Sequence, residues 1–256
     1  MAIIADILTQ VDAAATAVGA TAFDAVSAEI VPIFRVGSVL VVVLVGINLM
    51  AQAVPMTLRN GLGLMVRIAV ASAFLSSWTN FNAVYGVLTN APSEIGAVVI
   101  EAFGGGSGNL YEGLDSLYLQ ALDVGQAISQ NGSYITGALA GLLMFLVAAL
   151  MATVSIIVIS AAKIMIGVLV IFAPIAIACT LFKVTAPLFD RWVNLALGFA
   201  FYPMLTSGMA AFTMAIARDL TPASLASVET IGDVLSFVVV MMLGTGLMAM
   251  VPTIAQ

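Results

Sequence analysis

Histidine is absent from this chain of 256 residues, and Cys179 is its only cysteine. The first absence removes the side chain that most often serves as general base, metal ligand or charge switch near neutral pH. The second excludes an internal disulfide and a cysteine-rich metal site. The sequence has no Gly-x-Ser-x-Gly elbow and no phosphate-binding loop ending in Lys-Ser or Lys-Thr. We therefore expect a protein that is not an enzyme, without catalytic site, metal site or cofactor.

Charge is scarce as well. Only 8% of the residues are charged and 62% are hydrophobic, whereas soluble globular domains carry about 25% charged residues. The apolar residues fall in several separate blocks, which is typical of an integral helical bundle. The net charge is −6 and no basic tract is present, which argues against tight independent binding to nucleic acid. The sequence predicts an all-α polytopic membrane protein.

One internal segment lacks cations altogether. Residues 90–133 contain no Lys or Arg but carry five acidic residues, namely Glu94, Glu101, Glu112, Asp115 and Asp123. Cytoplasmic loops collect Lys and Arg, and moving charges through lipid is costly. We therefore expect residues 91–133 to form an extracytoplasmic central region that faces partners across the membrane.

Within this region the spacing predicts an amphipathic helix over about 110–130, hinged by the glycine-rich stretch 104–108. Its apolar face comprises Leu110, Leu114, Leu117, Tyr118, Ala121 and Ile128, and its polar face Glu112, Asp115, Asp123 and Gln126. The polar face could dock a partner through Glu112, Asp115 and Asp123. The alternative is a solvated cap without a partner.

The sequence before this region predicts a helix followed by a transmembrane hairpin. Residues 1–30 show helical periodicity, and residues 1–35 are expected to form an N-terminal amphipathic extracytoplasmic helix that lies on the membrane surface or packs on a partner. No cleaved signal peptide is expected. Residues 36–90 form the first transmembrane hairpin, with spans near 36–54 and 62–85. Aromatic residues follow at helical spacing in the second span, either as an interfacial belt or as core packing; they are Phe74, Trp78, Phe81 and Tyr85.

Residues 134–256 form a C-terminal transmembrane bundle. Spans fit 134–160, 192–217 and 234–251, and residues 164–182 form a further apolar segment broken by Pro174. Gly137 and Gly141 have the spacing that lets helices approach closely. Lys163 interrupts the apolar run, either as an anchor at the cytoplasmic end of a span or as a pore or subunit contact.

The distribution of cations favours one topology over another. If all six segments cross and the N-terminus lies outside, four cations fall inside and three outside. If residues 164–182 instead dip in and return near Pro174, five fall inside and two outside, because Lys183 and Arg191 move inside while Arg218 moves outside. The positive-inside rule favours this second arrangement. We therefore expect five full spans and one re-entrant segment, with six spans as the alternative.

The stretch from Lys163 to Trp192 resembles a family signature. An apolar segment has a Pro-Ile-Ala break and is followed by Leu-Phe, a Thr, a second Phe and a Trp that opens the next span; these are Pro174, Leu181, Phe182, Thr185, Phe189 and Trp192. This pattern is similar to the TrbL-like polytopic inner-membrane component of bacterial type IV secretion systems, the family of the sixth VirB component. The chain lacks the long hydrophilic C-terminal tail of some relatives, so functions of that tail are not carried over.

The resemblance implies an inner-membrane channel or platform subunit of a conjugation apparatus. Such a subunit is a homo-oligomer that helps DNA and protein translocation and pilus assembly. Its partners are a minor pilus-like stalk subunit, inner-membrane scaffold proteins, secretion ATPases and, transiently, the DNA or protein substrate. The N-terminus and residues 91–133 would be periplasmic. The candidate assembly and channel residues are Trp192, Phe189, Arg191, Pro174, Lys163 and Arg67.

Two rival functions follow from composition alone. A small-solute secondary transporter or permease would carry an ionisable group in mid-span and an inverted repeat. The acidic residues lie outside the predicted spans or at their ends, so no acidic group is placed in mid-span. No inverted repeat is evident, because the halves on either side of the central region differ in their number of spans. An autonomous pore of the holin kind would be shorter and have fewer spans. The transporter remains the principal alternative at this point.

Overall fold

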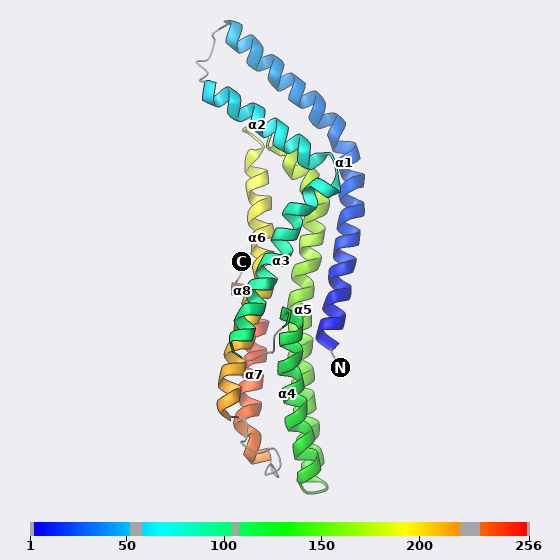
Figure 1. Ribbon diagram of the computed structural model, residues 1–256, viewed down its shortest axis with the longest axis vertical. Coiled ribbons are helices and arrows are strands. Elements are labelled where there is room, and N and C mark those ends of the chain that lie inside the picture. The colour runs from blue at the N-terminus through cyan, green and yellow to red at the C-terminus, as the bar shows by residue number, and fades with distance from the viewer. Residues whose placement is uncertain (1–2, 52–57, 104–107, 221–230, 255–256) are drawn as a thin grey trace. The chain divides into compact units, whose positions relative to one another are not determined.

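The computed structural model describes residues 3–51, 58–103, 108–220 and 231–254 (Figure 1). In these residues the regular structure is entirely helical. The elements are α1 (Ile3–Ala51), α2 (Leu58–Leu75), α3 (Trp78–Ala102), α4 (Leu110–Asn131), α5 (Thr136–Cys179), α6 (Ala186–Leu220), the 3-10 turn η2 (Ile231–Val234), α7 (Leu235–Ala249) and α8 (Val251–Ile254). The predicted all-α architecture is confirmed. The predicted glycine hinge lies mostly outside the described residues.

Several helices have the length and composition of membrane spans. Among the described residues α1, α3, α5 and α6 are long and apolar enough to cross a membrane. Gly61–Leu75 and Leu235–Ala249 are shorter apolar helical stretches. A span needs about 20 residues, and α5 alone has 44. These lengths confirm a polytopic membrane protein.

Several prolines lie inside helices, including the one at the expected break. Pro32 lies within α1, Pro92 within α3 and Pro174 within α5. The predicted return of residues 164–182 near Pro174 is therefore wrong, because α5 continues to Cys179 before the chain turns. Apolar surroundings favour backbone groups that are paired within the helix, and transmembrane helices tolerate proline where neighbouring groups compensate.

The predicted second span, residues 62–85, is two helices. α2 ends at Leu75 and α3 begins at Trp78. The side chain of Asp24 in α1 accepts a hydrogen bond from the Trp78 backbone N–H at 3.0 Å, and Ser76 Oγ donates to the carbonyl of Ala73 at 2.7 Å. Polar side chains thus occupy backbone groups that a continuous helix would pair internally.

The helices form two compact units, each built from segments distant in sequence. Unit 1 comprises Met1–Ala13, Thr89–Ile164 and Gly198–Gln256. Unit 2 comprises Ala14–Leu88 and Met165–Leu197. α4 packs antiparallel to the first part of α5 in unit 1 (Figure 1). The predicted division into 1–35, 36–90, 91–133 and 134–256 remains a prediction about function and sidedness.

The core of unit 1 centres on α4, whose predicted amphipathic character is confirmed. Its buried residues include five of the six assigned to its apolar face, and Tyr118 is partly buried. Small residues bring α5 close to α4. A Cβ atom on Gly141 would lie 2.9 Å from the Gly125 carbonyl oxygen, and one on Gly137 would lie 2.9 Å from that of Ile128. The close approach predicted from this glycine pair is therefore confirmed.

Unit 2 has an aromatic core. Phe23 of α1 stacks on Phe81 of α3 with ring centroids 4.8 Å apart, and Trp78 and Tyr85 continue the cluster. Phe81 and Tyr85 are buried, and the Tyr85 hydroxyl is 3.2 Å from Thr16 Oγ1. Of the two readings of the aromatic series, the structure favours core packing.

A matched pair of glycines in α7 tests the packing of unit 1. A Cβ atom on Gly244 would clash with Thr213 Oγ1, whereas one on Gly246 would meet nothing within 4 Å. We expect Gly244→Ala to lower the free energy of unfolding by about 1–3 kcal/mol through overpacking. Gly246→Ala should be neutral or slightly stabilising because alanine favours helix. Thermal denaturation in detergent micelles measures both; equal melting temperatures would contradict the close contact between α6 and α7.

Candidate functional site

Lys163 is buried in unit 1 and has a carboxylate partner. Its side chain is 6% exposed, and Nζ lies 3.1 Å from Oδ1 of Asp12, whose side chain is 32% exposed. Nζ also lies 3.5 Å from the backbone carbonyl oxygen of Thr89. The Tyr111 hydroxyl donates to the other oxygen of Asp12 at 2.5 Å. The ammonium and the carboxylate therefore neutralise each other, and hydrogen bonds occupy part of their remaining capacity.

A second carboxylate receives the amino end of α1. Asp115 of α4 is 3% exposed, and its two oxygens accept the backbone N–H groups of Ile4 and Ala5 at 3.0 and 2.9 Å. The first N–H groups of a helix have no partner within the helix, and the positive end of the helix dipole favours an anion there. Asp115 thus acts as a cap supplied by another helix.

The two carboxylates fix the first turns of α1 within unit 1. Asp115 holds the backbone of residues 4 and 5, and Asp12 contacts α4 through Tyr111 and α5 through Lys163. Ile4 and Leu8, which lie on the same face, are buried in the core of the unit. These contacts position α1, α4 and α5 relative to one another within unit 1, and the polar groups hydrogen-bond or pair with one another. In the described part of the chain no group of three acidic or cysteine side chains could hold a metal ion.

The sequence pattern predicts this cluster only in part. It singles out Lys163 but leaves its partner unnamed, because the chain offers thirteen acidic residues and periodicity does not choose among them. The spacing also assigns Asp115 to the solvent-facing side of its helix, and this placement is wrong. Helical spacing locates a residue on a face, but it does not show that the end of another helix covers that position.

The candidate residue Trp192 lies in unit 2, where it is half-buried near the start of α6. Its indole Nε1 donates to the backbone carbonyl of Leu169 in α5 at 2.9 Å. Its ring stacks near Phe189 at 5.9 Å and lies 6.4 Å from Phe81. A polar indole end in an apolar setting needs such a partner. Trp192 therefore links α6 to α3 and α5 within this unit.

Two further aromatic residues of α6 belong to unit 1. They are Phe199 and Tyr202, whose ring centroids lie 5.3 Å apart. Tyr202 is buried, and its hydroxyl lies 3.4 Å from the Pro252 carbonyl oxygen. The aromatic residues of α6 therefore pack in two different units.

The other candidates occupy varied positions. Pro174 is buried within α5, and the exposed Arg67 donates to the Thr180 carbonyl at 3.4 Å. Arg191 is exposed beside Trp192. On α4, Glu112 and Asp123 are exposed, so these two carboxylates remain accessible for docking while Asp115 does not.

The two partners of the Asp12–Lys163 ion pair differ in burial, so their single substitutions should cost different amounts of stability. Asp12→Asn leaves a buried ammonium without its counter-ion, and we expect a loss of about 3 kcal/mol, near the lower end for a broken buried pair because Asp12 is partly exposed. Lys163→Met leaves a partly exposed carboxylate that Tyr111 still contacts, so its cost should be smaller. The double variant should recover most of the loss, because an apolar replacement of a whole pair is often neutral.

Thermal denaturation in detergent micelles measures this cycle, with Asp6→Asn as the control. Asp6 is an exposed acid in the first turn of the same helix, and its substitution should change the melting temperature little. A double variant that is as unstable as Asp12→Asn alone would refute the pairing.

The long apolar helices and the motif at the connection between α5 and α6 lie in a part of the sequence that matches a known protein family. The family model described as TrbL/VirB6 plasmid conjugal transfer protein matches residues 38–251. This range runs from the apolar part of α1 to the beginning of α8 and contains Trp192 and Lys163. A search of curated proteins gives no match. Because the matched range covers most of the 256 residues, the chain belongs to the TrbL/VirB6 plasmid conjugal transfer protein family.

Proposed function

We propose that this protein is an inner-membrane subunit of a type IV secretion apparatus, where it forms part of the channel or platform that DNA and protein substrates use. The family match over residues 38–251 is the observation that carries this proposal. The protein acts by assembly and has no enzymatic activity. It assists pilus or stalk assembly together with a minor pilus-like subunit, scaffold proteins and secretion ATPases.

The acidic region supports an orientation. Four of its five carboxylates are exposed in the structure, and only that of Asp115 is buried. A cation-free, exposed acidic region is typical of an extracytoplasmic segment. We infer that the N-terminus and residues 91–133 lie in the periplasm, with Glu112 and Asp123 available to a basic partner surface.

The exposed apolar surface supports an assembly role. In α1 most of the large side chains between residues 36 and 50 are exposed, and Met50 is 89% exposed. Lipid or other subunits must cover such a surface, since contiguous apolar patches of this kind mark membrane or protein contacts. In a homo-oligomer embedded in the bilayer, lipid and neighbouring subunits would together cover this apolar surface.

A conjugation assay tests the proposal. Deleting the gene from a conjugative donor should abolish DNA transfer, and the wild-type gene should restore it. Trp192→Ala should insert but restore transfer poorly, because it removes ring packing worth about 3–5 kcal/mol and the hydrogen bond to Leu169. Trp192→Phe should restore more, since it retains the ring and loses a hydrogen bond worth about 1 kcal/mol.

Trp78→Ala is the matched control, because Trp78 packs in the same aromatic core but outside the motif region. If Trp192 serves assembly, its loss should reduce recovery of the secretion complex more than that of Trp78 does at equal amounts of inserted protein. Undiminished DNA transfer by the Trp192→Ala variant would contradict an assembly role for Trp192. Normal DNA transfer after deletion of the gene would contradict the proposed function itself.

Thiol labelling tests the orientation. In a Cys179→Ala background, single cysteines at Glu112 and Asp123, whose side chains are exposed, should react with a membrane-impermeant maleimide in intact spheroplasts. A cysteine at Asp115 should react weakly on either side because that position is buried. If the residue-112 and residue-123 cysteines react only after lysis, the central region is cytoplasmic and the orientation is wrong.

A further inference from the structure

α4 runs along the first part of α5 in unit 1. A Cβ atom on Gly141 of α5 would lie 2.9 Å from the Gly125 carbonyl oxygen, and one on Gly125 would lie 3.0 Å from Cβ of Met144. Nearer the start of α5, a Cβ atom on Gly137 would lie 2.9 Å from the Ile128 carbonyl oxygen. The residue numbers rise on α5 as they fall on α4, so the two helices are antiparallel, and Gly125 is level with residues 141–144.

α7 runs along the same part of α5, in the parallel direction. Ser155 of α5 donates a hydrogen bond to the Met248 sulfur at 3.1 Å, and Val158 shares a buried cluster with Val251, which follows α7. Counting back along both helices from the Met248 contact places the start of α7 near residue 142 of α5. α4 and α7 therefore lie in the same layer of unit 1.

The outer surface of this layer is apolar on α7. No residue from 235 to 249 is charged. The large side chains that α7 exposes are between 51% and 55% exposed; they are Leu235, Val239, Met242 and Leu243. The neighbouring helix α6, whose Thr213 lies against Gly244, also exposes Phe212 and Ile216. Lipid is the cover that suits such a surface, which places this layer at hydrocarbon depth.

The outer surface of α4 in the same layer is polar. Positions at alternating steps of four and three residues share one face of the helix and form its polar row; they are Glu112, Ser116, Leu119, Asp123, Gln126 and Gln130. Ser116 is partly buried, Leu119 is the one apolar member, and the other members are exposed polar residues. α4 has 22 residues, but it is not among the described helices whose composition suits a membrane span.

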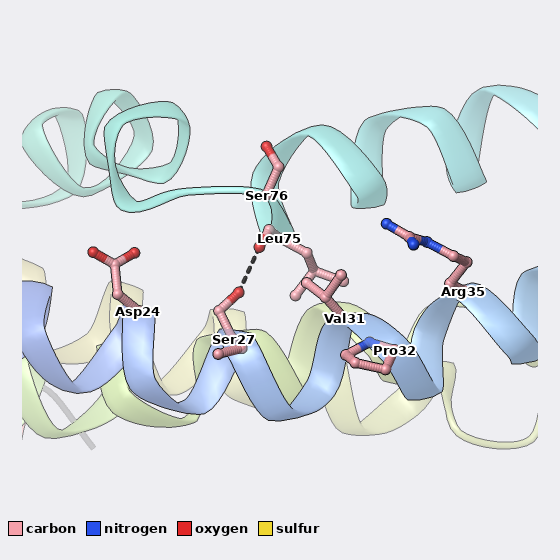
Figure 2. Close-up of a pocket in the computed structure, with 8 residues that line it drawn as sticks. Asp24, Ser27, Val31, Pro32, Arg35, Leu75 and Ser76 are labelled. Carbon is pink, nitrogen blue, oxygen red and sulfur yellow. Dashed lines mark hydrogen bonds between the residues drawn. The ribbon is translucent and has the colours of Figure 1, made fainter.

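The polar row keeps hydrogen-bonding groups that the chain itself does not use. Among the described residues no hydrogen bond or ion pair engages Asp123, Gln126 or Gln130. By contrast, Ser27 of unit 2 donates to the Leu75 carbonyl beside the hollow between α1 and the end of α2 (Figure 2). Unpaired polar groups cost free energy in hydrocarbon, and charged side chains at membrane depth face a bundle interior or a water-filled cavity. Because the row faces outward from unit 1, water must reach it.

We propose that the polar row of α4 lines a water-filled path that enters hydrocarbon depth from the periplasm and favours cationic solutes, including basic polypeptide segments, over anionic ones. The inference rests on the proposed channel function and specifies the surface that faces the aqueous side. Residues 90–133 contain no Lys or Arg, so no cation of this segment offsets Glu112 and Asp123. Carboxylates in a confined aqueous space raise the local concentration of cations. Residues 110–131 then contact periplasmic water from beside the lipid, which refines the orientation inferred above.

Cysteine labelling tests the path in spheroplasts of a strain that carries the whole secretion apparatus. In a Cys179→Ala background, Gln126→Cys and Gln130→Cys should react with membrane-impermeant methanethiosulfonate reagents. Val239→Cys and Leu243→Cys on α7, which lie in the same layer, should not react with these reagents but should react with the lipid-soluble N-(1-pyrenyl)maleimide. Recovery of each variant in the membrane fraction at the wild-type amount shows that it has inserted.

The charge of the reagent tests the preference for cations. Gln126→Cys should react about tenfold faster with the trimethylammonium reagent than with the sulfonate reagent, after each rate is divided by that of a free thiol, because Asp123 lies one helical turn away. Asp123→Asn should lower this ratio severalfold. Glu94→Gln is the matched control and should leave the ratio unchanged. Glu94 is exposed near Gly96, which lies against Leu110, so it is near the far end of α4, about 24 Å from residue 126 and beyond the range of unscreened charge.

Three results would overturn the proposal. Equal reaction of Gln126→Cys and Val239→Cys with the impermeant reagents would place the whole layer in water. No reaction of Gln126→Cys, or reaction only after lysis, would exclude a path open to the periplasm. Equal normalised rates for the two reagents would exclude the preference for cations. The labelling rates are measured without DNA transfer, so failure of the path and failure of the proposed function are separate results.

Discussion

A buried ammonium must have a nearby anion, and this constraint organises unit 1. Lys163 lies in an apolar part of α5, and Asp12 supplies the opposite charge from the first turns of α1. A lone charge in such surroundings would cost several kcal/mol, while a paired one costs far less. The pair therefore does little for net stability, but it specifies which part of α1 lies against α5. Tyr111 extends the same requirement to α4.

Elements governed by local pattern were predictable from the sequence. The amphipathic α4 follows from its spacing, and the close approach at Gly137 and Gly141 follows from the small size of glycine. Helix ends were less predictable, since prolines 32, 92 and 174 lie inside helices and the break at 76–77 is held by Asp24 of another helix. Proline limits the backbone locally, whereas a cap from a distant segment has no local signal.

The candidate site shows the same division. The sequence identified Lys163 as an exception to its apolar surroundings and Trp192 as part of a motif, and both have specific polar contacts in the structure. It did not identify Asp12 as the counter-ion or Asp115 as a cap. Each of these carboxylates gains its role from a helix far away in sequence, and a one-dimensional pattern of charge carries no such pairing.

The cap on α1 has a consequence for biosynthesis. The backbone N–H of Ile4 and its acceptor on Asp115 are separated by 111 positions in the chain. During translation Ile4 leaves the ribosome long before Asp115, which caps this turn of α1, has been added. The first turn of α1 therefore reaches its final contacts only after α4 has been synthesised, and any change that delays the synthesis of α4 also delays the capping of α1.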